Sequence, residues 1–174
     1  MKEMVRYGFI LSVICLVAAG LLAGLHNLTK SRILAQSEAE EAASLKEVLA
    51  QAADFAPIKK GNETLYYKAT DKDGKFLGVA FKAYADGYSS AIETMIGMLK
   101  DGTITAVKVL AQNETPGLGT RVTEPGFLQQ FSNKNIQNLG EVQAITGATI
   151  SSEAVIGAIK EKAEKIKALI KDGK

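Results

Sequence analysis

The sequence contains few of the residues that build metal and redox centres in proteins. Its 174 residues include one cysteine, Cys15, one histidine, His26, and no tryptophan. A single cysteine excludes an internal disulfide, and it excludes a structural zinc site or an iron–sulfur cluster whose cysteines all come from this chain. His26 has no partner ligands near it in the sequence, so we predict neither a metal site nor a catalytic residue. Any redox chemistry therefore requires a bound cofactor.

The chain also lacks a strong charge of either sign. Lysine and arginine together number 21, aspartate and glutamate number 19, and the net charge is +2. The basic residues are scattered along the chain, so we predict no nucleic-acid partner. The length suits one domain with attachments and a single sizeable core.

One long apolar segment stands near the beginning of the sequence. Residues 8–25 are apolar or small, with only Ser12 and Cys15 mildly polar. Together with Tyr7 and His26 they give about 20 residues, enough for a helix to cross a hydrocarbon core of roughly 30 Å. We predict a transmembrane helix over residues 7–26, and a cleaved signal peptide is the alternative. Basic residues flank both ends about equally, so the positive-inside rule does not predict which end of the helix lies in the cytoplasm.

The pattern changes twice after this segment. Residues 27–53 are rich in Ala, Glu and Lys, with Leu45, Val48 and Leu49 at helical spacing, and we predict a helical stalk. Residues 77–83 instead alternate between two faces, which is typical of a β-strand.

Two hairpins are predicted in this second part. Strands at 65–70 and 77–83 flank a turn at 71–74, and strands at 93–99 and 103–110 flank a turn at 100–102. A loop with glycine follows each hairpin, at 84–88 and 114–119, so we interpret the pair as a degenerate internal duplication. Phe127 and Phe131 have helical spacing and are predicted to lie in the core.

Small and hydroxyl residues gather near the end of the chain, at 146–152. Residues 142–145 are predicted to form a short strand, and apolar residues from 155 to 170 recur at helical spacing, with Ser151 or Ser152 as the expected N-cap. The first turn of a helix has unpaired N–H groups and the positive end of the helix dipole, which together favour an anion. The segment therefore predicts a phosphate site, and simple helix capping is the alternative.

Two blocks of residues resemble the hallmarks of the FMN-binding domain family. The sequence Thr146-Gly147-Ala148-Thr149-Ile150-Ser151-Ser152 looks like its flavinylation motif, whose last Thr is esterified to the phosphate of FMN by a flavin transferase. The sequence Glu114-Thr115-Pro116-Gly117-Leu118-Gly119 resembles its flavin-facing loop. With the predicted anchor and the length, the chain is similar to the FMN subunits of Rnf complexes, the ion-translocating ferredoxin:NAD oxidoreductases. One departure is Gln143, where the motif usually carries an acidic residue.

The resemblance implies an α+β protein with an antiparallel sheet packed with helices. It implies a cytoplasmic segment 1–6 and an extracytoplasmic FMN-binding domain over 54–174. The cofactor is FMN, attached through Thr149, and Gly117 and Gly119 are expected to let the backbone approach its ring. Thr149 is a tether because no activating group accompanies it. The expected site residues are Thr146, Gly147, Ala148, Thr149, Ser151, Ser152, Glu114, Thr115, Pro116, Gly117, Leu118, Gly119 and Tyr88.

The function implied by the resemblance is electron relay inside a membrane complex. The expected partners are the other membrane and peripheral subunits of an Rnf-like complex, and a flavin transferase for maturation. NAD and ferredoxin are expected to bind to those subunits, since this chain has no strand-linked G-x-G-x-x-G and no cysteine cluster. Three alternatives stay open: the FMN subunit of a Na⁺-translocating NADH:quinone reductase, a membrane-anchored module that binds a phosphate ligand without redox chemistry, and a structural stalk subunit.

Overall fold

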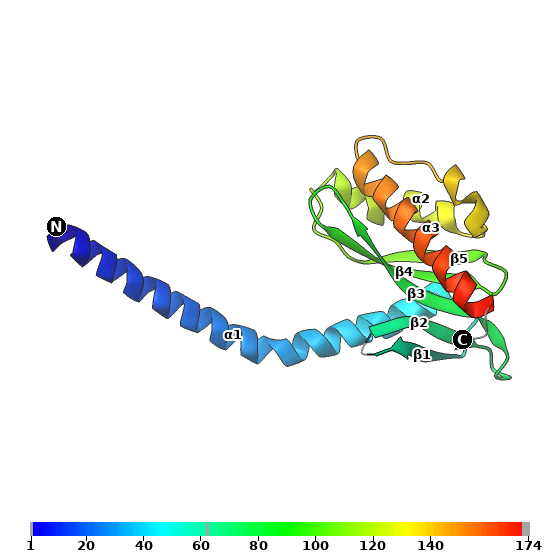
Figure 1. The fold of residues 1–174 in the computed structure, drawn as a ribbon, viewed down its shortest axis with the longest axis horizontal. Coiled ribbons are helices and arrows are strands. Elements are labelled where there is room, and N and C mark those ends of the chain that lie inside the picture. Colours follow the sequence, from blue (N-terminus) through cyan, green and yellow to red (C-terminus); the bar gives the residue numbers. More distant parts are fainter. Residues whose placement is uncertain (1, 62, 172–174) are drawn as a thin grey trace. The chain divides into compact units, whose positions relative to one another are not determined.

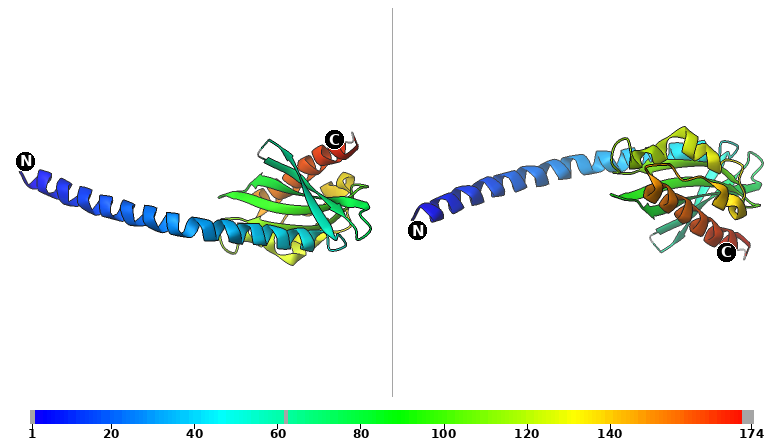
Figure 2. Two further views of the ribbon diagram at one scale, coloured as in Figure 1. Left: turned by 90° about the horizontal axis from the view of Figure 1, so that it is seen from below. Right: turned by 90° about the horizontal axis from the view of Figure 1, so that it is seen from above.

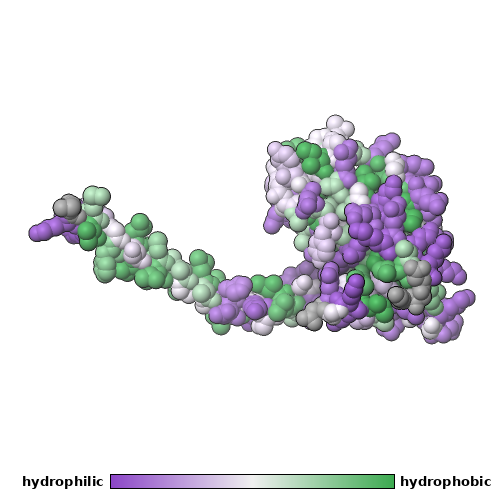
Figure 3. Space-filling model, viewed as in Figure 1, coloured by the Kyte–Doolittle hydropathy of each residue, from purple (hydrophilic) through white to green (hydrophobic). Residues whose placement is uncertain are grey.

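The computed structural model in Figure 1 describes residues 2–61 and 63–171, and the chain divides after Glu40 into two compact units. The first unit is helical and belongs to α1, which spans Lys2–Val48. Its apolar window has a mean hydropathy of 2.5, and it is the one helix in the described residues that is long and apolar enough to cross a membrane. Large apolar side chains cover much of its surface, as Figure 3 shows in green; Leu16, for example, is 72% exposed. The predicted apolar helix is therefore confirmed, and it fits a membrane anchor.

The second unit begins at Glu41 with the last turns of α1. Leu45, Val48 and Leu49 are buried there, and Leu45 and Val48 pack with Ala80 and Met95 of the sheet. Helical spacing in this part of the chain thus reflects packing onto a sheet. The chain leaves the helix after Val48 and enters the first strand at Asp54.

The sheet of the second unit is an antiparallel meander of five strands in the order β1-β2-β3-β4-β5. Both predicted hairpins are confirmed, as β2–β3 and β4–β5, while β1 was not predicted. In the first hairpin turn the carboxylate of Asp71 accepts hydrogen bonds from the N–H groups of Asp73 and Lys75, both at 2.9 Å. The strands are β1 (Asp54–Lys60), β2 (Glu63–Thr70), β3 (Phe76–Asp86), β4 (Ala91–Leu99) and β5 (Ile104–Ala111).

Helices cover both faces of this sheet. The long helix α3, Thr149–Lys171, packs on the face that carries Val79 and Phe81, and the last turns of α1 pack on the opposite face (Figure 2). The two faces of β3 are thus both buried. The α+β prediction is confirmed.

Short helical turns connect β5 to α3. Phe127 and Phe131 lie there in the main core, with ring centroids 5.3 Å apart in an edge-to-face arrangement, so their predicted burial is confirmed. The turns are η1 (Gly119–Thr123), α2 (Pro125–Leu128), η2 (Gln129–Phe131) and η3 (Ile136–Glu141).

Two predictions before α3 are wrong. Residues 142–145 form no strand: Val142 is buried in the core, but the backbone of Gln143 pairs with the side chain of Gln130 instead of with a sheet. The apolar pattern there reflects burial in a loop. The expected N-cap is also wrong, because α3 begins at Thr149 and both serines lie inside its first turn.

Candidate functional site

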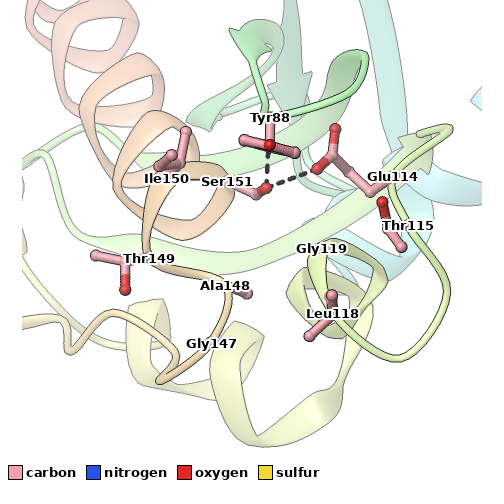
Figure 4. Close-up of a pocket in the computed structure, with 10 residues that line it drawn as sticks. All are labelled: Tyr88, Glu114, Thr115, Leu118, Gly119, Gly147, Ala148, Thr149, Ile150 and Ser151. Atoms are coloured by element: carbon pink, nitrogen blue, oxygen red, sulfur yellow. Dashed lines mark hydrogen bonds between the residues drawn. The ribbon is translucent and has the colours of Figure 1, made fainter.

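A pocket of about 420 Å³ opens where three segments of the second unit meet (Figure 4). The segments are the β3–β4 loop, the loop after β5 and the start of α3. A pocket of this size lies in the range of small-molecule and cofactor sites. Its lining residues are Tyr88, Glu114, Thr115, Leu118, Gly119, Gly147, Ala148, Thr149, Ile150 and Ser151.

The structure brings together nine of the thirteen residues expected at the site. The other four, Thr146, Pro116, Gly117 and Ser152, do not line the pocket but lie next to residues that do. The pocket thus has two walls that are separate in the sequence, the loop at 114–119 and the motif at 146–152.

The start of α3 is shaped by a tight turn and by Ser152. Gly147 adopts a φ of +84°, a conformation that favours glycine, and the N–H of Ala148 donates to the carbonyl of Ile145 at 2.9 Å. The Ser152 hydroxyl is fully buried; it accepts from the N–H of Ile145 at 3.0 Å and donates to the carbonyl of Ala148 at 2.8 Å. This serine ties down the turn from inside the helix, which explains why it is not the N-cap.

Thr149 is the first residue of α3, and its side chain is exposed beside the pocket. The first N–H groups of a helix have no intrahelical acceptors, and the helix dipole makes this end positive. Since α3 is 23 residues long, its dipole is fully developed at this end. An anion attached to the Thr149 hydroxyl would therefore lie close to the end of α3 that favours it.

The opposite side of the pocket holds a buried carboxylate, that of Glu114, which is 5% exposed. Its Oε2 accepts a hydrogen bond from Ser151 Oγ at 2.6 Å, and its Oε1 accepts from the N–H groups of Ser89 and Ser90 at 2.9 and 2.8 Å. Burial alone would raise the pKa of Glu114, but these donors, Ser151 foremost, outweigh it and hold the pKa below its ordinary value. The carboxylate is therefore ionised at neutral pH.

The loop after β5 owes its course to two glycines. Gly117 has a φ of +75°, and its N–H donates to Thr120 Oγ1 at 3.0 Å. Gly119 lines the pocket, yet the side on which a Cβ would stand is filled by the Glu114 carboxylate. The absence of a Cβ on Gly119 thus makes room for Glu114, and its expected place beside a ring stays a prediction.

Apolar and aromatic side chains are exposed around the pocket. Tyr88 is 73% exposed, Leu118 52% and Ile150 58%. Three large side chains open to solvent around one pocket leave apolar surface that a flat aromatic ligand would cover.

Sequence reasoning missed Ile150, the serine pair Ser89 and Ser90, and Arg121. Ile150 stands inside the motif and was passed over because its neighbours carry the hydroxyls. The guanidinium of Arg121 donates to the carbonyl of Thr146 at 3.0 Å and also pairs with Glu124 at 3.5 Å, so the motif is contacted by a cation that already has one partly exposed counter-ion. Arg121 and Thr146 are 25 positions apart, so no local pattern could have indicated their contact.

Two family models match this chain, one over the segment that contains the pocket residues and one over the apolar helix. The family described as FMN-binding domain matches residues 87–164, and the family described as RnfG N-terminal region matches residues 1–48. The G subunit of an ion-translocating oxidoreductase complex from Methanosarcina acetivorans is 35% identical, over 96% of this chain and 96% of that protein. The chain belongs to the family of these G subunits.

Other G subunits are similar over most of their length. The G subunit of a proton-translocating ferredoxin:NAD⁺ oxidoreductase complex from Clostridium ljungdahlii is 30% identical over 90% of this chain and 88% of that protein. The G subunit of a Na⁺-translocating complex of the same kind, from Acetobacterium woodii, is 29% identical over 91% of this chain and 89% of that protein. All ten pocket residues of this chain lie within the segment that matches the FMN-binding domain.

Proposed function

We propose that this chain carries FMN covalently on Thr149 and relays electrons within an ion-translocating ferredoxin:NAD oxidoreductase complex. One observation carries the proposal: the exposed Thr149 hydroxyl, at the positive end of α3, borders a pocket whose other wall is the second motif of the FMN-binding domain family. FMN supplies reversible electron uptake, and the protein supplies position and electrostatics.

The phosphate of FMN fits the start of α3. A phosphoester at Thr149 Oγ1 would hold the phosphate, and the first-turn N–H groups and the hydroxyl of Thr146 would be available to its remaining oxygens. Arg121, held against the carbonyl of Thr146, lowers the cost of bringing a phosphate charge to this turn. Thr149 acts as a tether, because the one histidine and the one cysteine of the chain, His26 and Cys15, both belong to the first unit.

The flat ring of FMN fits the other end of the pocket. Leu118 and Ile150 offer apolar surface, and Tyr88 offers an aromatic ring beside them. Two N–H groups and two serine hydroxyls already donate to the carboxylate of Glu114, so they fix the pocket wall in place before a ligand arrives.

The setting of this relay is a membrane complex. The apolar helix fits an anchor, and we propose that the second unit lies on the extracytoplasmic side, where a covalent bond prevents loss of the cofactor. A flavin transferase forms that bond, and partner subunits bind ferredoxin and NAD. The relatives named above are all G subunits, which favours this assignment over a subunit of an NADH:quinone reductase.

The proposal is tested by flavin fluorescence of the denatured chain. The full-length chain is produced in membranes together with a flavin transferase, solubilised, denatured and separated by electrophoresis. We expect fluorescence on the wild-type chain and on Thr123→Ala, which removes an exposed hydroxyl outside the pocket, and none on Thr149→Ala. Fluorescence that persists on denatured Thr149→Ala would contradict attachment at this residue.

A further inference from the structure

The Glu114 carboxylate is held in the pocket wall by an extensive set of hydrogen bonds. Four donors from two other segments surround it: the N–H groups of Ser89 and Ser90, the Ser90 hydroxyl at 3.3 Å and the Ser151 hydroxyl. Donors of this kind favour the charged form of a carboxylate. The Glu114 carboxylate therefore connects all three segments that form the pocket.

Two glycines keep space for this anion. A Cβ on Gly87 would stand 2.6 Å from Glu114 Oε1, and a Cβ on Gly119 would overlap Oε2. No real Cβ makes contacts this close, so any larger residue at either position displaces the carboxylate or the loop. The backbone at both glycines thus lies too close to the Glu114 carboxylate for any other residue to fit without a shift.

The charge of Glu114 has no ionic partner among the residues that the structure describes. The ion pairs found in residues 2–61 and 63–171 all involve other carboxylates, and the nearby Arg121 pairs with Glu124 at 3.5 Å. Its hydrogen-bond donors are neutral, so they stabilise the anion and reduce its field but leave its net charge of −1 in place. An unneutralised negative charge therefore faces the pocket in a place that is only 5% exposed to screening water.

We propose that the fixed negative charge of Glu114 lowers the midpoint potential of a flavin bound in the pocket. The charge does so because it disfavours the reduced form of the flavin, which is more negative than the oxidised form. This inference rests on the proposed function. Transfer of two electrons from a neighbouring carrier, with uptake of one proton from solvent, leaves one more negative charge on the bound group. A carboxylate that faces the same pocket opposes that change and leaves the oxidised form, whose ring is neutral, almost unaffected.

The test compares midpoint potentials of the full-length, flavin-loaded chain in detergent. Glu114→Gln keeps the shape of the side chain and removes the charge. Glu141→Gln is the matched control, because that carboxylate also lies between β5 and α3 in the sequence but does not line the pocket, and its side chain is 63% exposed. Potentials are read by spectroelectrochemistry at about pH 7, where a carboxylate with a lowered pKa is ionised.

We expect Glu114→Gln to favour the reduced form at least tenfold, which is an upward shift of about 30 mV for a two-electron couple. Glu141→Gln should change the same equilibrium less than twofold. A Glu114→Gln protein that loads normally and keeps the wild-type potential overturns the inference while leaving the proposed function intact. A wild-type chain without flavin overturns the proposed function itself.

A second measurement tests the inference if the Glu114→Gln chain does not acquire covalent flavin. The same quantity is then measured without the tether, as the ratio of the Kd values of oxidised and reduced riboflavin on Thr149→Ala and on Thr149→Ala/Glu114→Gln. A tenfold change of this ratio in favour of the reduced form supports the inference, and an unchanged ratio overturns it. Loss of all riboflavin binding on the double variant, with the fold retained by circular dichroism, also overturns it, because Glu114 would then hold the ring in place and not tune it.

Discussion

Ser151 Oγ donates a hydrogen bond to Glu114 Oε2 at 2.6 Å, and this contact joins the start of α3 to the loop after β5. The two residues are 37 positions apart in the sequence and both are buried. The contact connects the segment proposed to hold the phosphate with the segment proposed to hold the ring. Its removal should therefore affect stability as well as cofactor loading.

Ser151→Ala should lower the free energy of unfolding by about 1–3 kcal/mol. The reason is that one oxygen of a carboxylate that is only 5% exposed loses its hydroxyl donor. Ser89→Ala is the matched control: it removes a hydroxyl from the same cluster but keeps the N–H that donates to Glu114. Urea denaturation of the two variants measures the difference, and equal loss in both would contradict the role given to Ser151.

Stability of the second unit should fall with acid in a way that depends on Glu114. Its pKa is lowered in the folded chain, because the hydrogen bonds outweigh the opposing effect of burial. A carboxyl whose folded pKa lies below its unfolded value contributes stability that is fully present above the unfolded pKa, about 4.3, and is lost as the pH falls through the folded pKa. Glu41 and Asp101 have lowered pKa values and act in the same direction.

The contribution of Glu114 is isolated by the difference between wild type and Glu114→Gln across this pH window. Thermal unfolding measured from about pH 7 down to about pH 3 should show the wild type losing stability more steeply than the variant. Parallel curves for the two proteins would mean that Glu114 titrates normally in the folded state.

Gly119→Ala should disrupt the pocket more than another glycine substitution close by. Its Cβ would overlap Glu114 Oε2, and displacing a buried side chain costs about 1–3 kcal/mol. Gly126→Ala is the control, since its Cβ meets nothing within 4 Å. Urea denaturation and flavin content are the measurements, and unchanged values for Gly119→Ala would show that Glu114 has another position available.

The last turns of α1 are held to the sheet by Lys82. Its Nζ lies 2.7 Å from Glu41 Oε2 and 3.1 Å from Glu93 Oε1, with all three side chains about three-quarters buried, and Glu41 also accepts a hydrogen bond from Tyr67. Lys82→Met leaves two carboxylates together without a cation, so we expect a loss of about 1–3 kcal/mol.

Lys108→Met is the matched control for this prediction. Lys108 pairs with Glu47, which is 58% exposed, and such pairs contribute less than about 1 kcal/mol. Chemical denaturation in low salt compares the two variants. A loss for Lys82→Met no larger than for Lys108→Met would mean that the ion-pair cluster does not hold the helix.

Sequence patterns predicted the parts of this fold that depend on local order. Alternation revealed the two hairpins, and the apolar run revealed α1, because each pattern repeats along a single element. β1 was missed because its sequence, 54–60, carries Pro57 and alternates weakly at the edge of the sheet. The start of α3 was misplaced because Ser151 and Ser152 turn inward, one to Glu114 and the other to the preceding turn.

The candidate site could be predicted as two motifs but not as one pocket. Resemblance to a family identified both segments, whereas the contacts that join them come from residues far apart in the chain. Glu114 was expected to face a cofactor as part of a loop, and nothing in its neighbours indicated that Gly87, Ser89 and Ser151 enclose it. Such a cluster is visible only when the sheet has brought its loops to one end.

The central claim is the covalent bond between FMN and Thr149, and the most direct test is the mass of the denatured full-length chain from its own membranes. Fragmentation across residues 142–160 then locates any modification. We predict a mass increase equal to FMN less one water, localised to Thr149. An unmodified Thr149 in chains purified from membranes that contain the flavin transferase would contradict the account and leave the motif as a helix start with a simple phosphate site.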